Sequence, residues 1–304
     1  MSATETVLEF ACEGESLIGV LNRPDRPSDV GMLVLVGGPQ YRAGSHRLFV
    51  RLARAVAGQG HACLRFDSRG MGDSSGATAA FTESSPDVGA AIDAMMTAVP
   101  GLRRVVLWGL CDAASAALLY LDESGHDARV AGLCLLNPWV RSEHTLAQAR
   151  VKHYYVQRLR EGAFWRKLLT GGVAISAARE WLSQVQLALR GAQAGPTPAA
   201  RPPYQERMAR AWARSRAPLL LLLSGRDLTA QEFLQACAGS PSWRGALARG
   251  GVQRVDLPTA DHTLSTPEEA QTMIAQCLAW LAVLQPPAVA EAPGSRPEMS
   301  RAGA

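Results

Sequence analysis

The sequence predicts an α/β fold in which helices cover both faces of a mostly parallel sheet. Two observations carry this prediction. Short apolar runs recur along the chain, and segments with helical spacing of apolar residues separate them. A strand that is apolar along its whole length is typical of a parallel sheet that is covered on both faces.

The elements follow one another in a regular order. Residues 6–22 are expected to form two short strands joined by a turn that contains glycine. Further strands are expected at 32–36, 62–67, 104–110, 130–138, 218–225 and 252–258. Helices are expected around Leu48, Leu52 and Val56, at 87–99, from residue 111 onward and at 266–284. Thr266 is placed to cap the last helix, with Pro267 in its first turn.

The alternation of strands and helices breaks once, and this break predicts the domain organisation. Residues 139–217 are helical in character and rich in arginine and in aromatic residues. We therefore expect them to form an inserted helical cap over a core formed by 1–138 and 218–284. Residues 285–304 have the composition of a disordered tail. The length of 304 residues suits one large domain with such an insertion.

Composition excludes several classes of protein. No apolar run is long enough to span a membrane, and the first residues lack the pattern of a signal peptide, which predicts a cytoplasmic protein. The six cysteines lie far apart without a CxxC pair, so free thiols are expected instead of disulfides or a zinc site. No cluster of metal ligands and no cofactor motif appears, and we expect neither a metal nor a cofactor.

The charge is unevenly distributed. Residues 141–216 contain 14 Arg and Lys against four Glu, a formal charge of +10 in a chain whose net charge is +4. Such a segment suggests an anionic substrate, partner or surface. The alternative is a solvated arginine face, because the chain uses 29 Arg and only two Lys. No nucleic-acid partner is expected, since the basic residues belong to no recognised binding module.

Reactive residues follow three of the predicted strands. Cys111 follows the strand at 104–110, Asp227 follows the run "LLLLLSGR", and His262 follows "VDLPTAD". Because the carboxyl ends of parallel strands meet at one edge of a sheet, we expect these three side chains to lie together. The alternative for Cys111 is a buried structural thiol, and Asp261 competes with Asp227 as the acid.

Several motifs resemble the α/β-hydrolase superfamily. Residues 109–113, "GLCDA", fit the nucleophile elbow G-x-S-x-G with Cys in place of Ser and Ala in place of the final Gly. "FDSRGMGDSSG" at 66–76, "GRD" before the acid and "DHTLS" around the histidine are similar to the superfamily's usual segments. More narrowly, "VGGPQYRAGSHR" with "WGLCDAAS" resembles hydrolase 1 of the exosortase A-associated systems, which occur in bacteria that sort proteins and make extracellular polysaccharide.

The resemblance implies a catalytic triad and an oxyanion hole. Cys111 would be the nucleophile, His262 its base and Asp227 the group that orients the histidine. The backbone N–H groups of Asp112 and Gly38 would form the oxyanion hole, with Gln40 as the alternative donor. The expected activity is hydrolysis of an ester or thioester through an acyl-enzyme; acyl transfer to a saccharide or a carrier, and a non-catalytic scaffold, are the alternatives.

The side chain of Asp112 has three open interpretations. If it turned inward, its carboxylate would oppose formation of a thiolate at the neighbouring sulfur. It would otherwise point outward and complement the helix N-terminus, or bind a cationic group of the substrate. The glycine-rich segment "RGMGDSSG" at 69–76 lacks the lysine of a phosphate-binding loop, so we interpret it as a turn that shapes the pocket.

Overall fold

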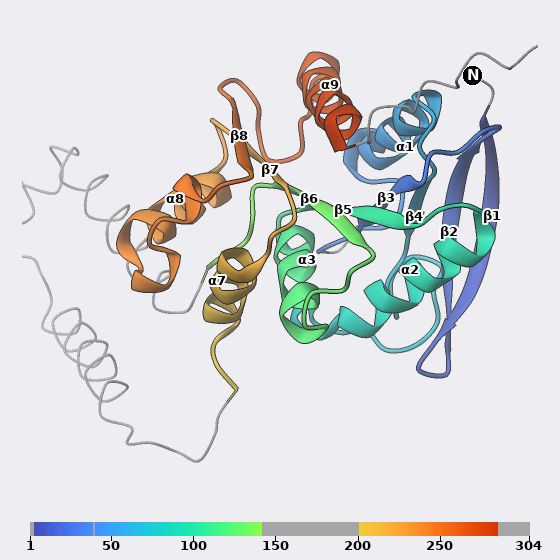
Figure 1. Cartoon of the computed structure of the whole chain (residues 1–304), viewed down its shortest axis with the longest axis horizontal. Helices are drawn as coiled ribbons and strands as arrows, with labels where there is room; N and C mark the ends of the chain where they lie inside the picture. The colour runs from blue at the N-terminus through green and yellow to red at the C-terminus, as the bar shows by residue number, and fades with distance from the viewer. Residues whose placement is uncertain (1–2, 39, 142–200, 285–304) are drawn as a thin grey trace, which may run out of the picture.

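The computed structural model describes residues 3–38, 40–141 and 201–284 (Figure 1). Its strands are β1 (Ala3–Cys12), β2 (Glu15–Pro24), β3 (Val30–Leu35), β4 (Cys63–Phe66), β5 (Arg104–Leu110), β6 (Val130–Leu136), β7 (Leu219–Ser224) and β8 (Val252–Leu257). Its α-helices are α1 (Leu48–Gly58), α2 (Ser85–Ala98), α3 (Asp112–Glu123), α7 (Tyr204–Arg214), α8 (Leu228–Gly239) and α9 (Pro267–Leu284).

All eight strands form one sheet in the order β1-β2-β4-β3-β5-β6-β7-β8. The pairs β1–β2 and β2–β4 are antiparallel, and every other neighbouring pair is parallel. The prediction of a mostly parallel sheet is therefore confirmed. Strand β5 lies at its centre, where Leu107 is paired with Leu33 of β3 on one side and Leu133 of β6 on the other.

Two hydrophobic cores cover the two faces of the sheet, as Figure 1 shows for the helices that flank it. Helices α2, α3, α7 and α8 pack on one face, and α1 and α9 pack on the other. Successive residues of β5 alternate between these cores: Leu107 faces the first, whereas Val106 and Trp108 face the second. Each such leucine, removed completely from water, contributes about 1.5–3 kcal/mol before entropy is counted.

The ends of the helices follow from local sequence. In the last helix, the N–H of Glu269 donates to the Thr266 hydroxyl at 3.3 Å, as the capping prediction requires. Asp227 caps α8 in the same way, because its carboxylate accepts from the N–H of Thr229 at 2.9 Å. This second cap fixes the position of the residue that we expected to act as the acid of the site.

Part of the predicted cap lies within the described residues. Helix α7 belongs to the range assigned to the cap, and it packs against the first face of the sheet, with Met208 and Trp212 buried. Residues 142–200 and 285–304 lie outside the described residues, so the cap and the tail stay predictions. In the part of the chain that the structure describes, no helix is both long and apolar enough to cross a membrane.

Candidate active site

Cys111 occupies a sharp turn between β5 and α3. Its backbone adopts φ 61° and ψ −122°, a conformation that L-residues other than glycine rarely adopt. The turn is held by a bond from the Cys111 N–H to the Leu136 carbonyl at 2.9 Å. The Cys111 carbonyl accepts from the N–H groups of Ser115 at 3.3 Å and Trp139 at 3.2 Å. The sulfur therefore sits at the start of α3 on a backbone that its neighbours hold in place.

The small residues around Cys111 are required by a close approach of two backbone segments. A Cβ atom added at Gly109 would lie 2.5 Å from the carbonyl carbon of Ala113, where no side chain fits. Ala113 itself is buried. The spacing that the sequence showed, Gly two residues before Cys111 and Ala two residues after, thus has a direct steric cause.

Asp227 and His262 form a hydrogen-bonded pair beside this turn. The His262 Nδ1 lies 2.7 Å from the Asp227 Oδ2. The Asp227 side chain is only 5% exposed, whereas His262 is 35% exposed and lines the cavity that contains Cys111. The alternative acid, Asp261, is engaged elsewhere, because its carboxylate accepts from the N–H of Thr263 at 2.9 Å.

The electrostatics of His262 favour a protonated ring. Its hydrogen bonds to Asp227 and to the Cys111 sulfur, in that order of importance, raise the pKa of His262 to about 10 against the opposing effect of burial. A protonated imidazole donates one N–H to the carboxylate and one to the sulfur. The arrangement therefore places a proton-bearing imidazole ring in the cavity that Cys111 also lines.

The N–H of Gly38, one of the two predicted oxyanion donors, already donates to a side chain of the protein. Gly38, with φ 58°, follows β3, and its N–H donates to the Asp112 Oδ2 at 2.8 Å. The Asp112 side chain is thus turned inward, toward Gly38, while its predicted effects on the Cys111 thiol and on a substrate stay predictions. Gln40, the alternative donor, lines the same cavity, and Pro39 lies outside the described residues.

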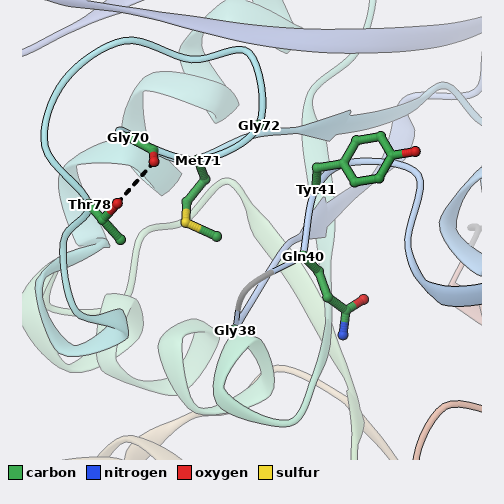
Figure 2. Close-up of a pocket in the computed structure, with 7 residues that line it drawn as sticks. All are labelled: Gly38, Gln40, Tyr41, Gly70, Met71, Gly72 and Thr78. Atoms are coloured by element: carbon green, nitrogen blue, oxygen red, sulfur yellow. Dashed lines mark hydrogen bonds between the residues drawn. The ribbon is translucent and has the colours of Figure 1, made fainter.

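Three cavities surround this loop. The cavity of Cys111 and His262 has a volume of about 360 Å³, and a second of about 270 Å³ shares Gly37, Gly38, Phe81 and Asp112 with it. A third, of about 550 Å³, lies between the loop of Gly38 and the glycine-rich loop (Figure 2). In Figure 2 the Met71 side chain lies between these two loops, whereas the Tyr41 ring points away from the Met71 side chain. Within the described residues, no group of three or more His, Cys, Asp or Glu could hold a metal ion.

Sequence reasoning missed the aromatic wall of the Cys111 cavity. Trp139 lines it together with Phe49 and Phe81. Trp139 follows β6, a strand after which the sequence analysis named no functional residue. Its place after a buried parallel strand was the available signal, since such positions face the site whether or not their side chains are reactive.

The fold and the turn at Cys111 define a class of protein, and a comparison of the chain with family models gives the same class. The model of the alpha/beta hydrolase family matches residues 33–275, so the chain belongs to the alpha/beta hydrolase family. No curated protein sequence matches the chain at a significant level.

Solved structures support this membership at the level of the fold. The esterase Pf2001 of Pyrococcus furiosus is 15% identical, with a TM-score of 0.60 over 92% of this chain and 93% of the esterase. The alpha/beta hydrolase GrgF of Penicillium sp. sh18 is 15% identical, with a TM-score of 0.59 over 92% and 98%. The haloalkane dehalogenase DatA of Agrobacterium tumefaciens C58 is 17% identical, with a TM-score of 0.56 over 92% and 98%. At these identities the likeness concerns the fold alone.

Proposed function

We propose that this chain hydrolyses an ester or thioester through a Cys111–His262–Asp227 triad and a covalent acyl-enzyme. The observation that carries the proposal is the His262–Asp227 hydrogen bond of 2.7 Å, with His262 and the Cys111 of the strained turn lining one cavity. A buried structural thiol would need neither the strained turn nor the histidine.

The proposed reaction has two halves. The Cys111 thiolate attacks the acyl carbon, a C–S bond forms, and the carbonyl π electrons move onto the oxygen. The intermediate then expels the alcohol or thiol, which takes the proton of His262. In the second half, neutral His262 removes a proton from water, the hydroxide attacks the thioester, and the carboxylic acid leaves as the Cys111 thiolate returns. Asp227 stabilises the protonated imidazole and fixes its orientation throughout.

Intact-protein mass spectrometry after rapid mixing with a panel of acyl esters and thioesters tests the proposal. We expect the wild-type protein to gain the mass of the acyl group at Cys111 and the Cys111→Ala variant to gain none. Cys237→Ser is the matched control, because that thiol lies in another part of the protein, at the end of α8, and burial raises its pKa to about 12. The absence of any adduct and of any product with the wild-type protein would overturn the proposal.

Two further measurements separate the alternatives. Analysis of products in the presence of polyol or saccharide acceptors distinguishes acyl transfer, which yields a new ester, from hydrolysis, which yields the free acid. Labelling with iodoacetamide near neutral pH distinguishes an enzyme from a scaffold that retains the fold. An enzyme is expected to be modified at Cys111 before the other five thiols, and a scaffold is expected to react slowly at all six.

The physiological setting belongs to the same proposal. The segments that resemble hydrolase 1 of the exosortase A-associated systems support a role in bacterial protein sorting or exopolysaccharide production, in the cytoplasm. The positive charge of residues 141–216 favours an acyl group carried on an anionic molecule, such as phosphopantetheine or an acidic glycan. Equal turnover of neutral short-chain esters and of anionic acyl thioesters at low salt would contradict this choice of substrate.

A further inference from the structure

The carboxylate of Asp112 lies inside the site instead of at its rim. Its Oδ2 accepts from the Gly38 N–H at 2.8 Å. Its Oδ1 lies only 1.9 Å from the point where a Cβ atom of residue 37 would be placed, so the carboxylate fills the space that the absence of a side chain at Gly37 leaves. Both oxygens therefore lie against the loop that follows β3.

This position is the one that a reaction oxyanion would need. In the hydrolase family to which the chain belongs, the donors are the N–H of the residue after the nucleophile and an N–H of the loop after β3, here Asp112 and Gly38. Burial raises the pKa of Asp112 above its ordinary value, although hydrogen bonds from the backbone N–H groups of Gly38, Ala113 and Asp112 itself act in the opposite direction. A carboxylate held by these N–H groups presents to them the same charge and the same atom type as the oxyanion of a tetrahedral intermediate.

A purely structural role explains this geometry less well. Aspartate in the first turn of a helix is favourable because it complements the helix dipole. That effect is available with the side chain directed to solvent, where no desolvation is needed, yet this carboxylate is turned toward Gly38. In the described part of the chain no Arg or Lys forms an ion pair with it, and the positive charge that acts on it is that of His262.

Asp112 also lines two cavities at once. It belongs to the walls of the Cys111 cavity and of the second cavity, whose other walls include Met71, Ala80 and Ala116. Rotation of the side chain away from Gly38 would free the backbone donor and, in the same movement, change the partition between these cavities. The same side chain therefore contacts a backbone donor and lines both cavities.

We propose that Asp112 is a specificity-determining residue whose carboxylate occupies the oxyanion hole of the free enzyme and must be displaced by the acyl substrate. The inference rests on the proposed function. A substrate that makes many contacts supplies the binding energy for this displacement, whereas a small activated ester does not. The carboxylate therefore suppresses the acylation of Cys111 by small acyl donors more than by the cognate substrate.

The test compares two reactions of the same sulfur. Acylation by p-nitrophenyl acetate needs both the thiolate and the oxyanion hole, whereas alkylation by iodoacetamide displaces iodide from a saturated carbon and needs the thiolate alone. Asp112→Ala removes the charge and the acceptor oxygens together. Asp112→Asn removes the charge and keeps an acceptor oxygen that reaches Gly38.

We expect Asp112→Ala to acylate about 10- to 100-fold faster than the wild-type protein, since each oxyanion donor is worth about 10²–10³ in rate. Asp112→Asn is expected to gain less than about tenfold in acylation. Both variants are expected to be alkylated by iodoacetamide at the same rate, only a few-fold faster than the wild-type protein. The gain of Asp112→Ala is expected to shrink as the acyl chain of the p-nitrophenyl ester is lengthened.

Three outcomes would overturn the inference. The first is an equal gain in acylation and alkylation for Asp112→Ala, which would show that the carboxylate acts only by repelling the thiolate. The second is equal acylation of the Ala and Asn variants, and the third is slower acylation of Asp112→Ala with alkylation unchanged. Asp112→Gly repeats the test if the Ala variant does not fold, as judged by circular dichroism.

A control variant and a separate readout complete the design. Asp256→Ala removes an exposed carboxylate of β8 that pairs with Arg254, and it is expected to leave both rates unchanged. A gain in this variant would point to general charge and overturn the inference. Failure of the proposed function looks different, because no variant would then form an acyl adduct at Cys111 while alkylation continued.

Discussion

The thiols of Cys111 and Cys277 occupy opposite kinds of environment in one small protein. Cys277 belongs to α9 and is fully buried in the core, with its sulfur 3.5 Å from that of Cys134 and 3.5 Å from that of Met273. Cys111 is partly exposed on a strained turn, at a helix N-terminus and beside a histidine. Burial raises the pKa of Cys134 well above its ordinary value. The same functional group therefore packs as a small apolar side chain in one place and lies beside a histidine in a cavity in the other.

The backbone and one neighbour distinguish Cys111 from the buried thiols, and the proposed function assigns its reactivity to these two features. Cys63, also fully buried, has its pKa raised to about 12 by burial although it lies on the same sheet. Partial exposure does not distinguish Cys111, since Cys237 is also partly exposed and burial raises its pKa to about 12. Cys111 differs from both in its contact with His262.

The largest effect is expected from removing the reactive sulfur. Cys111→Ala should lower the rate of p-nitrophenolate release by about 10⁴-fold or more, because loss of a triad nucleophile leaves only the residual catalysis of the site. Steady-state kinetics with p-nitrophenyl butyrate measure it. Cys63→Ala is the matched control on the other kind of thiol and is expected to keep the activity per folded molecule. Similar losses in both variants would break the comparison between the two environments.

The next largest effect is expected at Asp227, whose carboxylate is the largest cause of the raised pKa of His262. Asp227→Asn removes the largest cause of the raised pKa of His262, so this pKa should fall from about 10 toward the ordinary value of 6.5. The rate of acylation at pH 8 should fall by about 10²–10⁴-fold, because His262 then loses its proton at this pH and its ring is no longer oriented by a carboxylate. NMR titration of the His262 ring measures the pKa, and stopped-flow kinetics measure acylation.

The sign of the linked change in stability follows from the same pKa. A histidine whose pKa is higher in the folded state adds stability that is complete below about pH 6.5 and disappears as the pH rises through about 10. The excess stability of the wild-type protein over Asp227→Asn should therefore decline between these two values. Asp261→Asn is the matched control, and a similar fall of the His262 pKa in that variant would assign the orienting role to the wrong carboxylate.

Much of the fold was predictable because its signals are local. Fully buried strands such as β3 and β7 are continuous apolar runs, and a run of this kind has few places in a protein other than a covered parallel sheet. The place of Asp227 and His262 was predictable for a related reason, since each follows a strand whose carboxyl end lies at one edge. Chain order and strand direction were sufficient to bring them together.

The details that decide chemistry were less accessible to sequence reasoning. The inward rotation of Asp112 depends on the space left by Gly37, a residue 75 positions earlier, and on a hydrogen bond from Gly38. No local pattern encodes a side-chain torsion that a distant loop decides. Trp139 was missed for a different reason: its contribution is its ring and its bond to the Cys111 carbonyl, neither of which marks a residue as reactive.

The smallest effect is expected at the buried thiol of Cys277, where the stability of the protein is measured instead of its activity. Cys277→Ser places a more polar hydroxyl in a fully buried site beside the sulfurs of Cys134 and Met273, which should lower the free energy of unfolding by about 1–3 kcal/mol. Urea denaturation measures this change, with Cys237→Ser as the matched control that should cost less because its site is partly exposed. Alkylation of Cys111 by iodoacetamide should keep its rate in both variants, since neither substitution touches the turn or His262. A slower reaction of Cys111 in Cys277→Ser would mean that the two thiol environments are coupled through the sheet, and the reactivity of Cys111 would then depend on more than its own turn and its histidine.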